Sequence, residues 1–188
     1  MSETPPGPLD KNLASWSRAY DIFSQTNTLF GSGITPEDII QGAIGDCWFM
    51  SAASAIAEVP GRMEKVFLNE ENGLNAAGIY AVNFYTLGIP HTVVVDDYLP
   101  LMPSREKKPK LVSDDKPKDE EKKRTLFARA GADGSLWGAF LEKAFAKHHG
   151  NFKHIEGGDP RKAVHSLYGG PYTTYFHDFL GSHLGLWE

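Results

Sequence analysis

The stretch around Cys47 constrains the fold of this chain more than any other. Two glycines, Gly42 and Gly45, precede Cys47, and an apolar, alanine-rich run follows it. A run of that length without glycine or proline is typical of a buried helix, and the preceding glycines are typical of a tight turn. The sequence therefore predicts a central helix from Cys47 to about Glu58, with the sulfur in its first turn.

Cys47 is the only cysteine in the chain, so it can form neither an internal disulfide nor a four-thiolate metal site. Unpaired backbone N–H groups at a helix start stabilise a thiolate, which is the form that attacks carbonyls. Gln41 lies on the preceding loop, and its amide, with the Cys47 N–H, could supply two donors to an oxyanion. An ordinary buried cysteine is the alternative. The glycine-flanked Gln41 and the indole of Trp48 favour a nucleophile.

The residues around this cysteine resemble the active-site segment of papain-type cysteine proteases, and resemble the calpain family more closely. The segment that carries the resemblance reads Asp38-Ile39-Ile40-Gln41-Gly42-Ala43-Ile44-Gly45-Asp46-Cys47-Trp48. Further similar blocks follow in the same order at Gly78–Tyr80, Val93–Pro100, Leu136–Trp137, Leu141–Lys147, Gly150–Phe152 and Gly157–Gly158. The resemblance runs from about Trp16 to Gly170.

This resemblance implies an α+β, papain-like cysteine proteinase fold and, within it, the N-terminal, nucleophile-bearing lobe. The activity implied is calcium-dependent cysteine endopeptidase action on protein substrates, with Cys47 as nucleophile and Gln41 in the oxyanion hole. By the same resemblance, calcium is held by the Gly31 and Gly33 carbonyls, Asp38 and Glu142. Without the family, Asp38 is an acid that favours a helix start and Glu142 is a solvated helix residue.

Hydrophobic periodicity and capping residues predict the remaining elements. The expected elements are a short helix that begins at Thr35-Pro36, hairpin strands at 79–86 and 92–98, and helices at 135–149 and from Asp159 to Leu167. With the central helix, they give packed helices and one β-hairpin, which agrees with the implied lobe.

Four regions are expected along the chain. Residues 1–12 read as a disordered leader, 13–171 as the catalytic lobe, and 172–188 as an aromatic-rich tail that begins a truncated or absent second lobe. Within the lobe, residues 104–124 hold nine Lys or Arg and six Asp or Glu, which predicts a mobile, charged insertion. That insertion is either a solvated addition or a docking or regulatory cleavage site.

A cysteine nucleophile needs a base. His177 and His183 lie at the spacing that papain-like enzymes use, but His177 is followed by Asp178 and no Asn occurs after Asn151. We therefore expect the His and Asn on a second catalytic lobe beyond Glu188, a partner without which this chain is inactive. The other histidines lack metal-ligand spacing and are expected in surface or packing roles.

Charge and hydropathy exclude several classes of function. The net charge of −5 argues against nucleic acid as a partner, because phosphate binding favours a basic surface. No apolar run is long enough for a transmembrane segment, and the first residues lack signal-peptide features. A single thiol is typical of a reducing, cytoplasmic setting. The competing hypothesis is a non-catalytic calpain-like module that binds calcium or a protein.

Overall fold

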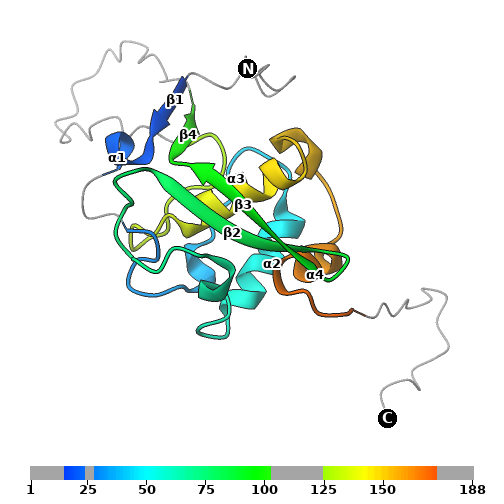
Figure 1. Ribbon diagram of the computed structural model, residues 1–188. Coiled ribbons are helices and arrows are strands. Elements are labelled where there is room, and N and C mark those ends of the chain that lie inside the picture. Colours follow the sequence, from blue (N-terminus) through cyan, green and yellow to red (C-terminus); the bar gives the residue numbers. More distant parts are fainter. Residues whose placement is uncertain (1–14, 24–27, 103–124, 173–188) are drawn as a thin grey trace, which may run out of the picture.

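The computed structural model describes residues 15–23, 28–102 and 125–172, which form an α+β fold (Figure 1). Its α-helices are α1 (Ala19–Ile22), α2 (Cys47–Ala57), α3 (Trp137–His148) and α4 (Pro160–Tyr168). The 3-10 helices are η2 (Pro36–Asp38), η3 (Glu64–Val66) and η4 (Phe152–Ile155). Strand β1 (Ser15–Arg18) pairs antiparallel with β4 (Tyr98–Leu101), and β2 (Ile79–Thr86) pairs antiparallel with β3 (Ile89–Asp96).

The expected α+β class is confirmed, and the central helix begins at the residue that the sequence indicated. The predictions for the leader (1–12), the charged insertion (104–124), residues 173–188 of the tail, His177 and His183 lie outside the described residues.

Stacked aromatic rings join the two longest helices and the hairpin. Phe49 of α2 lies 3.7 Å from Phe145 of α3, with their rings 9° from parallel. Tyr80 of β2 stacks on Phe140 of α3 at 3.9 Å. All four rings are at most 1% exposed, so each contributes its full apolar area to the core. Figure 1 shows the β2–β3 hairpin laid across α3, with α4 beside the hairpin turn.

The hairpin turn is shorter than the sequence suggested. A two-residue turn at Leu87-Gly88, with φ of 53° and 79°, joins Thr86 to Ile89, so β3 begins three residues before the predicted start at Thr92. Pro90 is accommodated because β3 is an edge strand and needs no partner on its outer side.

Long-range pairing of β1 was not predicted. The predicted second strand ran on to Tyr98, but the chain turns at Asp97 and residues 98–101 pair instead with β1. Arg18 fixes the pairing of β1 with β4, because its Nε donates to both oxygens of the buried Asp97 at 2.9 and 3.1 Å.

The free edge of β3 is covered by Lys147, whose Nζ donates to the Val94 carbonyl at 2.7 Å.

Local capping signals are reproduced closely. The Asp159 side chain accepts from the Arg161 N–H at the start of α4, and Gly169 ends that helix with φ of 71°. The short helix expected near Thr35 is a single 3-10 turn, in which the Thr35 N–H donates to Asp38 Oδ2 at 2.8 Å.

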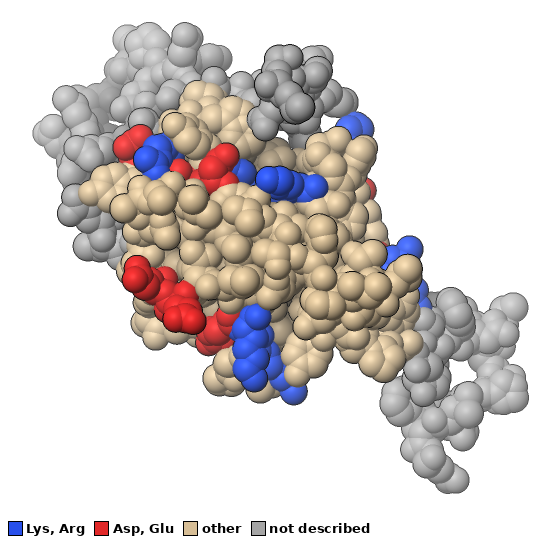
Figure 2. Space-filling model, viewed as in Figure 1, with Lys and Arg blue, Asp and Glu red and all other residues tan. Residues whose placement is uncertain are grey.

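Charged side chains lie around the hairpin face rather than over its centre (Figure 2). Apolar side chains of the hairpin are exposed there, among them Ile79, Ile89 and Val94. Within the described residues, no helix combines the length and the apolar character needed to cross a bilayer.

The hairpin turn yields a stability prediction. Leu87 is 90% exposed and holds a left-handed backbone conformation that costs an L-residue free energy, whereas Asn adopts it readily. We expect Leu87→Asn to raise the free energy of unfolding by about 0.5–1 kcal/mol in urea denaturation. Leu68→Asn is the matched control, because Leu68 is also exposed but has negative φ. An equal effect of both substitutions would contradict the prediction.

Candidate active site

The loop that carries Gln41 is anchored by the backbone of residues 126–129. The Ala43 N–H donates to the Leu126 carbonyl, and the Arg129 N–H donates to the Ile40 carbonyl, both at 2.9 Å. Between these contacts, Gly42 lies so close to Phe127 that a Cβ on Gly42 would sit 2.0 Å from the Phe127 carbonyl oxygen. This glycine is therefore required by close backbone packing.

Cys47 is the first residue of α2 and is exposed. The Asp46 carbonyl accepts from the N–H groups of Phe49 and Met50 at 2.8 and 3.1 Å, but the Asp46 side chain does not cap the helix. An exposed sulfur at the positive end of a helix is the arrangement in which a thiolate is stabilised.

Gln41 folds back onto its own loop. Its Nε2 donates to the Ile44 carbonyl at 2.7 Å and, through a longer contact of 3.3 Å, to Asp46 Oδ1. Both amide hydrogens are thus directed into the turn that ends at Cys47. The side chain is fixed relative to the start of α2 by bonds within six residues.

Trp48 fastens the start of α2 to a second segment. Its indole Nε1 donates to the Ile155 carbonyl at 2.8 Å, and its ring packs edge-on against Phe145 at 5.5 Å. A Cβ on Gly158 would lie 2.3 Å from the indole ring, so only glycine fits beneath it. The sequence marked Trp48 as a motif residue, and the structure gives it this anchoring contact.

Two carboxyl groups are buried behind the loop. Asp46 is fully buried and Glu142 of α3 is 1% exposed, so the expectation of a solvated Glu142 is wrong. Burial and the neighbouring Asp46 charge raise the pKa of Glu142 well above its ordinary value. Burial also raises the pKa of Asp46, although the hydrogen bonds from Glu142 and Gln41 lower it.

The sequence held a signal for this burial that the helix pattern obscured. The neighbours of Glu142 one helical turn away on either side are Gly138 and Ala146, both buried. Small residues at such positions indicate close packing of a helix face rather than a solvated one. Asp46 was missed because its only distinction in the sequence is its place beside Cys47.

The residues expected to hold calcium divide between two places. Asp38 Oδ2 accepts from Thr35 N–H and from Trp137 Nε1 at 2.8 and 3.1 Å, near the 31–33 loop. Glu142 does not join this network, because its Oε2 accepts from Ala128 N–H at 2.9 Å and its carboxyl faces Asp46. Among the residues described, no three His, Cys, Asp or Glu side chains cluster closely enough to hold a metal.

Asp133 occupies the place beside the glycine loop that Glu142 was expected to fill. Its Oδ2 accepts from Ser32 N–H at 2.8 Å and would lie 1.8 Å from a Cβ on Gly31. Burial raises the pKa of Asp133, but hydrogen bonds from Ser32 and Ser135 outweigh it and lower the pKa overall. The carboxylate is therefore ionised at neutral pH.

The histidines of the described segments are held by structural contacts. These contacts are His148 with Thr86 Oγ1, His149 with the Phe145 carbonyl, His154 with the His149 carbonyl, His165 with the Gly170 carbonyl, and the His91 ring 5.5 Å from His148. None of these contacts involves Cys47. Burial, together with His149 and His91, lowers the pKa of His148 and favours its neutral form.

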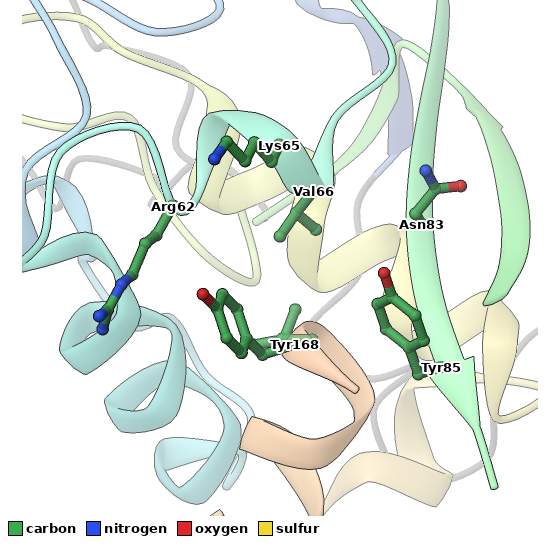
Figure 3. Close-up of a pocket in the computed structure, with 7 residues that line it drawn as sticks. Arg62, Lys65, Val66, Asn83, Tyr85 and Tyr168 are labelled. Atoms are coloured by element: carbon green, nitrogen blue, oxygen red, sulfur yellow. The ribbon is translucent and has the colours of Figure 1, made fainter. Parts of the chain in front are cut away.

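A small pocket of about 180 Å³ lies between η3, β2 and α4 (Figure 3). Arg62 and Lys65 line it on one side, and the rings of Tyr85 and Tyr168 point toward it from β2 and α4. The Arg62 guanidinium lies 5.7 Å from the Tyr168 ring centroid. This cation–π contact holds Arg62 against Tyr168, so Arg62 already has a partner within the pocket wall.

Comparison with known proteins identifies similar sequences over most of the chain. A model of the calpain family cysteine protease matches residues 7–188. The rice (Oryza sativa subsp. japonica) calpain-type cysteine protease ADL1 is 32% identical over 163 residues, which cover 84% of this chain and 7% of that protein. Calpain-5 of Caenorhabditis elegans is 31% identical over 164 residues, covering 85% of this chain and 22% of its own length.

The human calpain-2 catalytic subunit is 33% identical over 158 residues, covering 82% of this chain. The chain spans 19% of that protein, and between 7% and 22% of the other two. The similarity therefore concerns one part of much longer proteins.

The close approach of Gly42 to Phe127 predicts a sensitive position. Gly42→Ala would force the loop away from the 126–129 backbone, and we expect the free energy of unfolding to fall by about 1–3 kcal/mol. Gly73→Ala is the control, because no atom lies within 4 Å of a Cβ there. Urea denaturation of both variants measures the difference, and equal stabilities would refute the packing argument.

Proposed function

Because this chain belongs to the calpain family of cysteine proteases, we propose that it carries the nucleophile of a cysteine endopeptidase. The observation that supports this most strongly is the exposed Cys47 at the first turn of α2, directly after a loop on which the Gln41 amide is fixed. An exposed thiol at a helix start, followed by an anchoring Trp48, suits attack on a carbonyl carbon better than a packing role.

In the proposed reaction, the Cys47 thiolate forms a bond to the carbonyl carbon of a substrate peptide. The carbonyl π electrons move to the oxygen, and the resulting oxyanion accepts hydrogen bonds from the Cys47 N–H and the Gln41 amide. Gln41 Nε2 also donates to the Ile44 carbonyl at 2.7 Å and to Asp46 Oδ1 at 3.3 Å, and these bonds hold the amide on the loop before Cys47. Collapse of the intermediate breaks the C–N bond and expels the amine, which leaves a thioester on Cys47, and water then hydrolyses this thioester to release the acid and the thiol.

The amine needs a proton to leave, and the thiol needs a base to lose one. We propose that a His oriented by an Asn, on a second catalytic lobe, transfers this proton. The described histidines are engaged in other contacts, which supports a base from elsewhere. Protein substrates follow from the family, and a reducing, cytoplasmic setting suits a catalytic thiol.

Calcium is proposed to act on the 31–38 loop. The carbonyls of Gly31 and Gly33, with Asp38, form an oxygen-rich loop of the kind that a hard cation prefers, and Asp133 adds a carboxylate beside it. Positive φ at both glycines allows the tight turn that brings the carbonyls around. Glu142 does not fit this set. When bound, calcium would supply positive charge to a loop that lies nine residues before Cys47.

The alternative is a non-catalytic calpain-like module that binds calcium or a protein partner. The loop around Gly31 and Asp38 favours it, because that loop is separate from the sulfur and could bind calcium without catalysis. Peptide cleavage that is lost in Cys47→Ala would exclude this alternative. Calcium binding without any cleavage, even after a His-bearing lobe is added, would support it.

The proposed catalysis predicts how Cys47 reacts. An electrophilic inhibitor should alkylate Cys47 slowly in the 188-residue chain and faster once a His-bearing lobe is added, because the base raises the thiolate fraction. Labelling measured by mass spectrometry should vanish in Cys47→Ala. An unchanged labelling rate on adding the lobe would count against the proposed base.

In the assembled enzyme, Gln41→Ala should lower kcat by about 10²–10³-fold. Ser51→Ala, on the exposed side of α2, is the control.

The proposed calcium loop predicts selective stabilisation. Calcium at 100 times its dissociation constant should add about 2.7 kcal/mol to the free energy of unfolding. This gain should be lost in Asp38→Asn and weakened in Asp133→Asn, whereas Glu142→Gln should keep it. Thermal denaturation with calcium and with magnesium measures the effect. Loss of the gain in Glu142→Gln alone would return Glu142 to the ligand set.

A further inference from the structure

The buried carboxyls of Asp46 and Glu142 form a pair directly behind the nucleophile loop. One oxygen of each has an ordinary donor: Asp46 Oδ1 accepts from Gln41 Nε2 at 3.3 Å, and Glu142 Oε2 accepts from Ala128 N–H at 2.9 Å. The other two oxygens, Asp46 Oδ2 and Glu142 Oε1, are buried and meet no N–H or O–H donor within the described segments. The two carboxyls nevertheless interact, and each shifts the pKa of the other: the contact lowers that of Asp46 and raises that of Glu142.

Two carboxylates cannot bond to each other unless one carries a proton, because ionised carboxyls only accept. Burying both as anions would remove two charges from water, and their mutual repulsion would add to that unfavourable free energy. The interaction favours ionised Asp46 and neutral Glu142, since it lowers the pKa of Asp46 and raises that of Glu142. The Glu142 O–H is therefore the donor.

Other titratable groups near the pair do not replace this proton. Cys47 follows Asp46 in the chain and is exposed. Glu156 lies beyond Gly45, with its Cγ 3.5 Å from the place of a Cβ on that glycine. Lys143, the next residue of α3, directs its Nζ to Asp96 and to the Tyr98 carbonyl.

We propose that Glu142 is a positioning residue of the nucleophile loop: its protonated carboxyl donates to Asp46, whose other oxygen holds the Gln41 amide beside Cys47. The existence of this brace does not depend on the proposed function. Its catalytic meaning does, because it rests on Gln41 as an oxyanion donor.

The brace connects α3 to the loop through a continuous line of hydrogen bonds. It runs from Ala128 N–H to Glu142, through the shared proton to Asp46, and on to Gln41 and the Ile44 carbonyl. If the proton is lost, two buried negative charges face each other and the contact becomes repulsive. Repulsion would push Asp46 from its place, and Gln41 would keep only its bond to the Ile44 carbonyl.

The test uses Glu142→Gln, Glu142→Ala and Glu64→Gln, the last as a control at a half-buried glutamate outside the pair. Gln mimics the protonated carboxyl, because its amide can donate to Asp46 and accept from Ala128. In NMR spectra of the 188-residue chain, the Gln41 side-chain N–H signals should be protected from exchange in the wild type and in Glu142→Gln. Protection should fall in Glu142→Ala, where only the bond to the Ile44 carbonyl would remain. Equal protection in all variants would overturn the proposal.

Stability against pH gives a second readout, which remains informative if Glu142→Ala fails to fold. A carboxyl whose pKa is raised in the folded state binds more protons there than when unfolded. Wild-type stability should therefore fall as pH rises from the ordinary glutamate range to the raised value. Glu142→Gln should reduce this slope to the part that Asp46 contributes, because the pKa of Asp46 is also raised, and Glu64→Gln should keep the whole slope. An undiminished slope in Glu142→Gln would overturn the proposal.

Activity of the assembled enzyme separates this proposal from the proposed function. Glu142→Ala should lower kcat by about 10²-fold with little change in KM, and Glu142→Gln should recover most of it. Full kcat in a folded Glu142→Ala would overturn the positioning role while leaving the protease assignment intact. If no turnover occurs but Gln41 protection depends on Glu142, the brace is supported and the proposed function fails.

Discussion

The stacking of Phe49 on Phe145 is the contact on which the arrangement of the site depends. These rings lie 3.7 Å apart and are nearly parallel, which fixes α2 against α3. Cys47 begins α2 two residues before Phe49, and Glu142 precedes Phe145 by three on α3. The same apolar contact thus sets both the place of the sulfur and the place of the buried carboxyl.

A polar brace inside this apolar core is costly to form and specific once formed. Asp46 and Glu142 lose solvation on folding, and only a shared proton together with donors from Gln41 and Ala128 offsets that loss. An apolar pair of similar size would stabilise the core at least as well, but it could not fix the orientation of an amide. The polar pair therefore serves to orient the Gln41 amide, whereas the aromatic stack stabilises the fold.

Local signals in the sequence predicted local structure well. The start of α2 and both ends of α4 follow from neighbouring residues, and the hairpin follows from two β-rich runs with a turn between them. Contacts between distant segments were not predictable in this way. The pairing of β1 with β4 depends on Arg18 and Asp97, which are 79 residues apart. The residues next to each of them in the sequence give no indication of this contact. The sequence predicted an exposed Glu142, because helix periodicity places charged residues on the solvent-facing side. It contains no information on whether a buried carboxyl is protonated.

Helix α3 contacts both regions that matter for the proposed activity. Near its start, Trp137 Nε1 donates to Asp38 beside the glycine loop, and five residues later Glu142 meets Asp46 behind the nucleophile. A helix of this length moves largely as one unit, because hydrogen bonds join successive turns of its backbone. A displacement of the Asp38 loop that pulled on Trp137 would therefore also displace Glu142. One path between the two regions therefore runs through a single packed helix, α3, in addition to the anchored chain from Asp38 to Cys47.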